Sequence, residues 1–193
     1  AKVLRDNGVR VPIAVTGAGV DHLSNASSVE LPETIRAQLA AFNFLHISSC
    51  FPRKGVDVLL RSYAQSFSAH DDVCLVIKTF PNPHNHVTEE LRALRQERAD
   101  FPRVLVINED WSQEWIAALY RCAHAFVAPS RGEGFGLPLA EAMLFGVPVI
   151  ATAWGGHTDF CTDETAWLCD YAFAKAQTHL GLTHSLWAEP NVQ

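Results

Sequence analysis

The chain has 193 residues, enough for one domain with a hydrophobic core; 48% of them are apolar and 19% are charged. Its formal net charge of −6 argues against the broad basic surface of nonspecific nucleic-acid binding, so we expect no nucleic-acid partner. No apolar run reaches the roughly 18 residues of a membrane span, and Ala1 to Arg10 lack the apolar centre of a signal peptide, so we expect a cytoplasmic protein.

Residues 1–42 do not share the alternation of strand and helix patterns found in the rest of the chain. Within them, Pro12–Asp21 has an extended character and contains a Gly-Ala-Gly turn. Because the chain also lacks an initiator methionine, we interpret it as a piece of a longer polypeptide. We predict that residues 1–29 are an interdomain connection or the remnant of an N-terminal domain, and that residues 30–193 form one domain.

From about Asn43 onward, short β-rich runs alternate with amphipathic helical patterns. The predicted strands are Phe44–Ser49, Val73–Lys78, Val104–Asn108, Ala125–Pro129, Pro148–Thr152 and Ala166–Cys169, and the predicted helices are Gly55–Phe67, Thr88–Arg98, Ser112–Cys122 and Gly136–Phe145. This alternation predicts a doubly wound α/β domain with a parallel, Rossmann-like sheet. Ligands of such domains bind in the loops after the carboxyl ends of the strands.

The five cysteines are scattered and lack Cys-x-x-Cys spacing, which indicates buried free thiols in a reducing compartment. The acidic pairs Asp71-Asp72 and Glu109-Asp110 and the histidines His84 and His86 have no third metal ligand nearby in the sequence. We therefore predict no metal site.

A glycine-rich loop follows the strand Ala125–Pro129 and leads into a helix. Its sequence, residues 130–141, is SRGEGFGLPLAE, with a proline suited to a first helical turn. The free backbone N–H groups and the dipole of such a helix start form an anion site. The loop matches neither a Walker A motif nor the Gly-x-Gly-x-x-Gly spacing of a dinucleotide fold.

Glu141 is the only Asp, Glu, Lys or Arg between Gly134 and Thr158, and it lies in an otherwise apolar helix. An ionised group buried there needs hydrogen-bond donors. Either protein groups, including the backbone of its own helix start, or the hydroxyls of a ligand can provide them. A ribose diol offers two suitable donors.

Glu133 and Glu141, with seven residues between them in this glycine-rich setting, resemble the signature of group 1 retaining glycosyltransferases of the GT-B fold. The resemblance continues through Gly146–Thr152 and Gly155-Gly156, and upstream through Lys54–Asp57, so that it covers nearly the whole chain. It implies that the chain is the nucleotide-sugar-binding half of a GT-B fold, truncated at its C-terminal end, with Glu189-Pro190 approaching a missing final helix.

The resemblance implies two catalytic residues: Glu133 beside the donor sugar, and Lys54 against the negative charge of the departing diphosphate. It also implies donor-binding residues around them, with Glu141 on the ribose and Asn108 near the base. The remaining implied donor contacts are Arg53, Ser130 and the backbone of Gly134, Phe135, Gly136 and Leu137.

The chain departs from the family pattern at two positions. The family arginine five residues before the lysine is Ser49 here, so Arg53 or Arg131 would have to take its place on the phosphate. The closing glutamate of the family's Gly-Gly-x-x-Glu pattern is Asp159 here, one methylene shorter, so its contact with the sugar would differ.

The activity implied by the resemblance is metal-independent transfer of a hexose, with retention at the anomeric carbon and without a cofactor. The donor would be GDP-mannose or a UDP-hexose, and the acceptor a glycan or a lipid-linked glycan in bacterial surface-polysaccharide synthesis. Because the acceptor would bind the absent N-terminal domain, we expect this fragment alone to be inactive and the full-length protein to be peripheral at the inner membrane. The alternatives are a non-catalytic nucleotide-binding module and a sugar-nucleotide epimerase or phosphorylase of the same fold.

Overall fold

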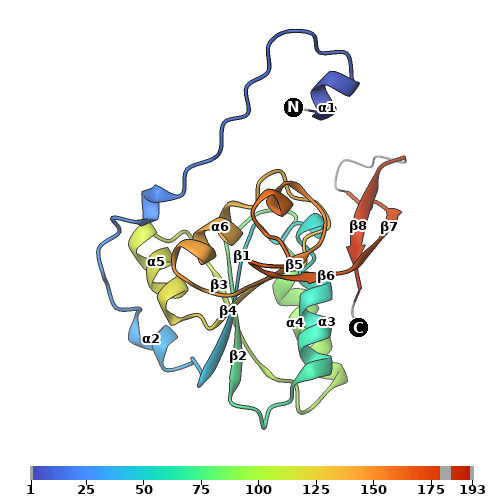
Figure 1. Cartoon of the computed structure of the whole chain (residues 1–193). Helices are drawn as coiled ribbons and strands as arrows, with labels where there is room; N and C mark the ends of the chain where they lie inside the picture. The colour runs from blue at the N-terminus through green and yellow to red at the C-terminus, as the bar shows by residue number, and fades with distance from the viewer. Residues whose placement is uncertain (1, 179–183, 192–193) are drawn as a thin grey trace.

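The computed structural model describes residues 2–178 and 184–191. Its centre is a six-stranded, fully parallel sheet with the strand order β3-β2-β1-β4-β5-β6 (Figure 1). The strands are β1 (Phe42–Ile47), β2 (Val73–Thr79), β3 (Arg103–Asn108), β4 (Ala125–Ala128), β5 (Val149–Thr152) and β6 (Trp167–Cys169). This is the strand order of a Rossmann-like doubly wound sheet, whose direction of winding reverses between β1 and β4.

Helices cover both faces of the sheet (Figure 1). They are α2 (Glu33–Arg36), α3 (Val56–Ser66), α4 (Val87–Glu97), α5 (Gln113–Cys122) and α6 (Leu137–Leu144). One cluster of buried apolar side chains joins α3 and α4 to the sheet, and a second joins α5 and α6 to its other face. Two covered faces explain why the central strands are apolar on both sides.

The predicted fold class and all ten predicted elements are confirmed, with boundaries that differ by one or two residues. A separate antiparallel hairpin, formed by β7 (Tyr171–Lys175) and β8 (Leu186–Pro190), was not predicted from the sequence. Glu189 and Pro190, interpreted as the approach to a missing final helix, belong to strand β8, and the missing helix stays a prediction. No helix in residues 2–178 and 184–191 is long and apolar enough to cross a membrane. All five cysteines are free thiols, but only Cys50, Cys74 and Cys161 are buried as expected, whereas Cys122 and Cys169 are half-buried.

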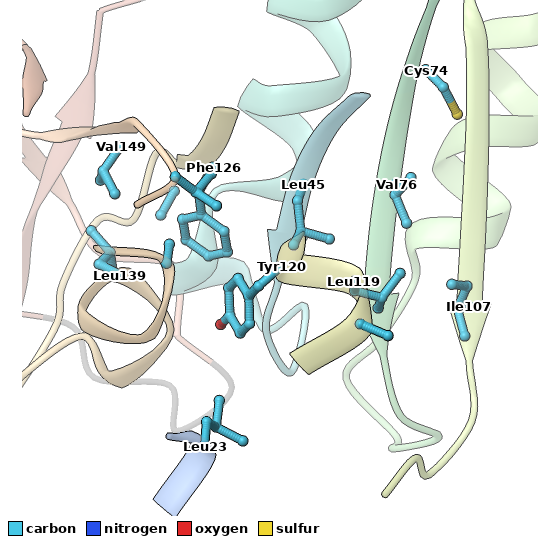
Figure 2. Close-up of a cluster of buried hydrophobic side chains, with 14 of the residues drawn as sticks. Leu23, Leu45, Cys74, Val76, Ile107, Leu119, Tyr120, Phe126, Leu139 and Val149 are labelled. Atoms are coloured by element: carbon cyan, nitrogen blue, oxygen red, sulfur yellow. The ribbon is translucent and has the colours of Figure 1, made fainter. Parts of the chain in front are cut away.

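The N-terminal segment lies partly apart from the sheet and partly against it. Figure 1 shows α1 (Lys2–Asp6) and the extended chain after it lying away from the helices and strands. The single turn η1 (Asp21–Leu23) brings Leu23, 2% exposed, into the core cluster that contains Tyr120 and Leu139 (Figure 2). Packing against the domain thus begins near residue 21, while the predicted boundary at residue 30 stays a prediction.

Gly55 allows two turns to meet at the reversal point of the sheet. It follows the 3-10 turn η2 (Pro52–Lys54) and precedes α3, with a left-handed φ of 69°. A Cβ at this position would lie 2.0 Å from the carbonyl oxygen of Pro129, at the end of β4. Both the backbone conformation and the close approach therefore require glycine.

Replacing Gly55 with alanine should destabilise the fold more than the same change at Gly146. Gly146 also has a φ of 69°, but no described atom lies within 4 Å of its Cβ position. Gly146→Ala should cost about 1 to 2 kcal/mol for the left-handed backbone, and Gly55→Ala about 1 to 3 kcal/mol more for the clash. Urea unfolding of both variants measures the difference, and equal losses would contradict the close approach.

Candidate functional site

The candidate site lies at the carboxyl ends of β1 and β4, the two strands between which the sheet reverses its winding. These strands pair in parallel, with Leu45 opposite Phe126, so the loops that follow them leave the sheet side by side. The loop after β1 contains η2 and Lys54, and the loop after β4 contains Ser130, Glu133 and the start of α6. This is where doubly wound sheets place their ligands.

Lys54 and Glu133, the two predicted catalytic residues, form an ion pair across these loops. The Lys54 amine contacts the Oε1 atom of Glu133, and both side chains are largely buried, at 12% and 7% exposure. The hydroxyl of Ser130 donates to the same oxygen (2.9 Å). The site therefore brings together a cation, a carboxylate and a hydroxyl, and each is held in place by the others.

The turn after β5 packs against the glycine-rich loop and fixes the position of its backbone. The N–H of Gly156 donates to the carbonyl of Glu133 (2.8 Å), and a Cβ on Gly156 would lie 1.8 Å from the carbonyl oxygen of Gly134. On its other side the loop is open, since Gly134 is exposed and no described atom lies within 4 Å of its Cβ position. The glycine at 134 thus leaves free space, whereas the glycine at 156 allows close packing.

Helix α6 begins immediately after this loop. Gly136 precedes it in a left-handed conformation (φ 83°), and no acidic side chain occupies the first turn. Leu137, the first helical residue, is exposed, and the ring of Phe135 packs on Phe160 with centroids 5.2 Å apart. The N-terminus of α6 therefore carries a partial positive charge that no acidic side chain of its first turn offsets.

Of the two arginines proposed to replace the family arginine, Arg131 is unsuitable. Its guanidinium donates to Asp57, Glu189 and the carbonyl of Pro52, which together use all five of its N–H groups. Arg53 is 47% exposed and lies at the site, where it donates to the carbonyl of Gly132 (3.3 Å) and approaches Glu133 Oε2 (3.9 Å). Arg53 is consequently the arginine with free N–H groups.

Glu141 lies in α6 with partners on both carboxylate oxygens. The hydroxyl of Tyr120 donates to Oε2 (2.8 Å), and Nε2 of His22 lies 2.9 Å from Oε1. Burial, together with the negative charge of Glu141, raises the pKa of Tyr120, so the phenol stays protonated and donates. The protein partners of Glu141 thus come from other elements, Tyr120 in α5 and His22 in η1.

His22 comes from the N-terminal segment and reaches Glu141 from its exposed side. Its side chain is 36% exposed, whereas that of Glu141 is 9% exposed. A carboxylate oxygen can accept two hydrogen bonds, so a ligand hydroxyl can bind Oε1 either beside His22 or in its place. The contact with Tyr120, by contrast, is enclosed in the core.

Asn108 is not brought to Lys54 and Glu133 by any contact in the described residues. It ends β3, two strands away from β1, and its side-chain oxygen lies 3.5 Å from the Asn85 amide.

Lys78, at the end of β2, is buried and donates to the carbonyls of Thr79 (2.9 Å) and Glu109 (2.7 Å). Lys78 therefore links the end of β2 to the start of the loop after β3. Burial lowers the pKa of Lys78.

His46 is a residue that the sequence analysis did not single out, although a histidine in an apolar strand was a visible signal. It lies in β1, where Nδ1 donates to the carbonyl of Val127 (2.7 Å) and Nε2 accepts from the hydroxyl of Ser48 (2.7 Å). That hydroxyl oxygen also accepts from the N–H of Cys50 (3.0 Å), whose φ of 52° is left-handed. His46 thus supports the turn that leads to Lys54.

No group of three or more His, Cys, Asp or Glu residues within the described ranges is placed to hold a metal ion. Two buried polar atoms near the glycine-rich loop, Thr152 Oγ1 and His157 Nδ1, have no hydrogen-bond partner among the described residues. Buried polar atoms of this kind normally have a protein or water partner. They lie at the carboxyl end of β5 and in the turn after it.

The family described as "Glycosyl transferases group 1" matches residues 41–180. The lipopolysaccharide core biosynthesis mannosyltransferase LpsB of Rhizobium meliloti is 34% identical over 118 residues, which cover 58% of this chain and 33% of LpsB. The serotype-specific mannosyltransferase WbdA of Escherichia coli is 30% identical over 137 residues, covering 68% of this chain and 16% of WbdA. The chain thus spans about a third or less of the length of these relatives.

Two solved structures with the same fold resemble this chain to a similar degree. A sucrose-phosphate synthase from Thermosynechococcus elongatus aligns with a TM-score of 0.66 and 25% identity, over 88% of this chain and 42% of that one. The C-terminal domain of a group 1 family glycosyl transferase, LpcC, from Francisella tularensis aligns with a TM-score of 0.63 and 20% identity, over 77% of this chain and 78% of that domain.

The buried His46 should make stability depend on pH. Burial lowers its pKa from 6.5 to about 4, so the neutral form is the one that the fold accommodates. Its contribution is complete above pH 6.5 and is lost as the pH falls toward 4, by about 3 kcal/mol. His46→Gln, which keeps one donor and one acceptor, should flatten the free energy of unfolding over this range. Parallel curves for the two proteins in urea titrations at pH 4 to 7 would contradict the assignment.

Proposed function

The chain belongs to the group 1 glycosyl transferases, and on that premise we propose that it is the donor-binding half of an enzyme that transfers a hexose from a nucleoside diphosphate sugar. One observation carries the proposal: Lys54 and Glu133 form an ion pair at an open glycine-rich loop that leads directly into the start of α6. The positive groups suit a diphosphate, and the carboxylate suits the hydroxyls of a sugar.

The diphosphate would bind between the Lys54 amine and the N-terminus of α6. When the bond between the anomeric carbon and the diphosphate oxygen breaks, negative charge grows on that oxygen. A lysine already positioned there stabilises this charge without rearrangement, which is how preorganised sites lower a barrier. Arg53, exposed beside the pair, would add a second positive charge where the family arginine is missing. With these groups on the diphosphate, the reaction needs no metal ion.

Glu133 would orient the donor sugar by accepting hydrogen bonds from its hydroxyls. Its Oε1 atom already contacts Lys54 and Ser130, while Oε2 has Arg53 at 3.9 Å and retains the capacity to accept. We assign it an orienting and electrostatic role. The acceptor hydroxyl would attack the anomeric carbon with retention of configuration, forming the new glycosidic bond as its proton leaves toward the departing phosphate.

Glu141 would bind the ribose through Oε1, the oxygen that faces His22 and the exposed side. Tyr120 holds the other oxygen from the core, so the carboxylate is fixed in orientation before a ligand arrives. Asn108 would lie toward the base. Because two of the relatives are named mannosyltransferases, we favour mannose as the hexose and GDP-mannose over a UDP-hexose as the donor.

The acceptor, a glycan or a lipid-linked glycan, would bind a second domain. The chain spans a third or less of LpsB and WbdA, so these relatives contain a further length of protein that this chain does not cover. The reaction would then take place between the two domains. We accordingly propose that this chain binds the donor but does not transfer the sugar by itself.

Calorimetric titration of the chain with GDP, UDP, ADP and their monophosphates tests the proposal. At least one diphosphate should bind saturably. Lys54→Gln should weaken the diphosphate about tenfold or more and the monophosphate much less, since only the diphosphate reaches the lysine. Glu141→Gln should weaken both alike, because they share the ribose.

Lys175→Gln, which removes an exposed lysine in β7, is the matched control and should leave both affinities unchanged. Circular dichroism should show that the variants keep their helices. Absence of saturable binding to every nucleotide would contradict the donor function. Equal losses for diphosphate and monophosphate in Lys54→Gln would contradict the role of the lysine.

A further inference from the structure

Arg131 is the most extensively bonded side chain near the site. It makes two hydrogen bonds to Asp57 in α3 (2.7 and 2.8 Å) and two to Glu189 in β8 (2.7 and 2.6 Å). Its fifth N–H donates to the carbonyl of Pro52 (2.6 Å). The side chain is 6% exposed, and its guanidinium carbon lies 4.7 Å from the ring centre of Trp187. Arg131 therefore has no free donor for a ligand.

The backbone of Arg131 connects the same parts of the chain. Its N–H donates to the carbonyl of Arg53 (2.7 Å), in the turn after β1. Its carbonyl accepts from the N–H of Ala188 (3.1 Å), a fully buried residue of β8. Three segments far apart in the sequence, namely the turn after β1, the loop after β4 and the C-terminal hairpin, thus meet at one residue.

Lys54 follows Arg53 directly, and Glu133 is two residues from Arg131. The bonds of Arg131 therefore end next to both members of the ion pair in the donor site. A shift of either loop at this point would separate the Lys54 amine from the Glu133 carboxylate. The geometry of the pair therefore depends on contacts of Arg131 that involve neither Lys54 nor Glu133.

The charges of the Arg131 cluster, which consists of Arg131, Asp57 and Glu189, support a fixed arrangement. Burial would raise the pKa of Asp57, but the hydrogen bonds and charge of Arg131 hold it below its usual value. Burial alone would lower the pKa of Arg131, but the hydrogen bonds and charges of Asp57 and Glu189 raise it. Two bidentate contacts in fixed planes require the fork of a guanidinium, which a lysine does not offer.

Resting on the donor-binding function proposed above, we propose that Arg131 is a positioning residue. With Asp57 and Glu189, it holds the turn with Lys54 and the loop with Glu133 at the separation that the diphosphate sugar requires. The C-terminal hairpin, which pairs with no strand of the main sheet, becomes part of the support of the donor site through Glu189 and Ala188. A residue of β8 therefore influences donor affinity without contacting the donor.

Two variants test this role in the whole chain. Arg131→Lys keeps the charge and loses the fork, and Glu189→Gln removes one carboxylate but leaves the bonds to Asp57. Amide hydrogen exchange should rise about tenfold in peptides that cover Phe51–Gly55 and Gly132–Gly136, and should stay unchanged in α4. Affinity for whichever of GDP, UDP and ADP binds the wild type should fall about tenfold, with a smaller change for the monophosphate.

Glu164→Gln, in an exposed turn before β6, is the matched control for Glu189→Gln and should change neither readout. Unchanged exchange in both peptides would overturn the positioning role. An equal rise in α4 would also overturn it, since the arginine would then stabilise the fold as a whole and not the two loops. If the wild type binds a diphosphate and both variants bind it equally well, only the inference about Arg131 fails. If the wild type binds none, the proposed function fails first.

Discussion

The close approach of two backbone turns, one after β1 and one after β4, is the constraint on which the site depends. Gly55 packs against the carbonyl of Pro129, and the N–H of Arg131 donates to the carbonyl of Arg53. These contacts bring Lys54 and Glu133 together from loops 79 residues apart in the sequence. The parallel pairing of β1 and β4 makes the approach possible, because it starts both loops at the same edge of the sheet.

The site is held from several directions, and each support comes from a different part of the chain. At the carboxyl end of β1, neutral His46 and Ser48 stabilise the turn that leads to Lys54. The turn after β5 supports the backbone of Glu133 through Gly156. In helix α6, the two oxygens of Glu141 are bound by Tyr120 and His22. Rigid support behind an open loop is what a site needs to hold charged groups in position before a ligand arrives.

The sequence was sufficient to predict the sheet, its order of elements and the loop around Glu133, because apolar alternation and glycine placement are local signals. It also predicted that Lys54 and Glu133 would share a site, through the resemblance to a known family. It did not reveal the bonds of Arg131 to Asp57 and Glu189 or the contact of His22 with Glu141, since these join residues distant in sequence and no local pattern marks them. Strands β7 and β8 were missed because they pair only with each other, outside the alternating β and α pattern.

The most direct test of the account is a crystal structure of this chain with the nucleoside diphosphate that it binds. The account predicts the diphosphate between the Lys54 amine and the first turn of α6, with the ribose hydroxyls on Glu141 and with the Arg131 cluster unchanged. A nucleotide bound instead in the cavity of about 670 Å³ that Asp57, Arg131 and Trp187 help to line would contradict it. So would a nucleotide bound at the predicted edge of the sheet without contact to Lys54 or Glu141.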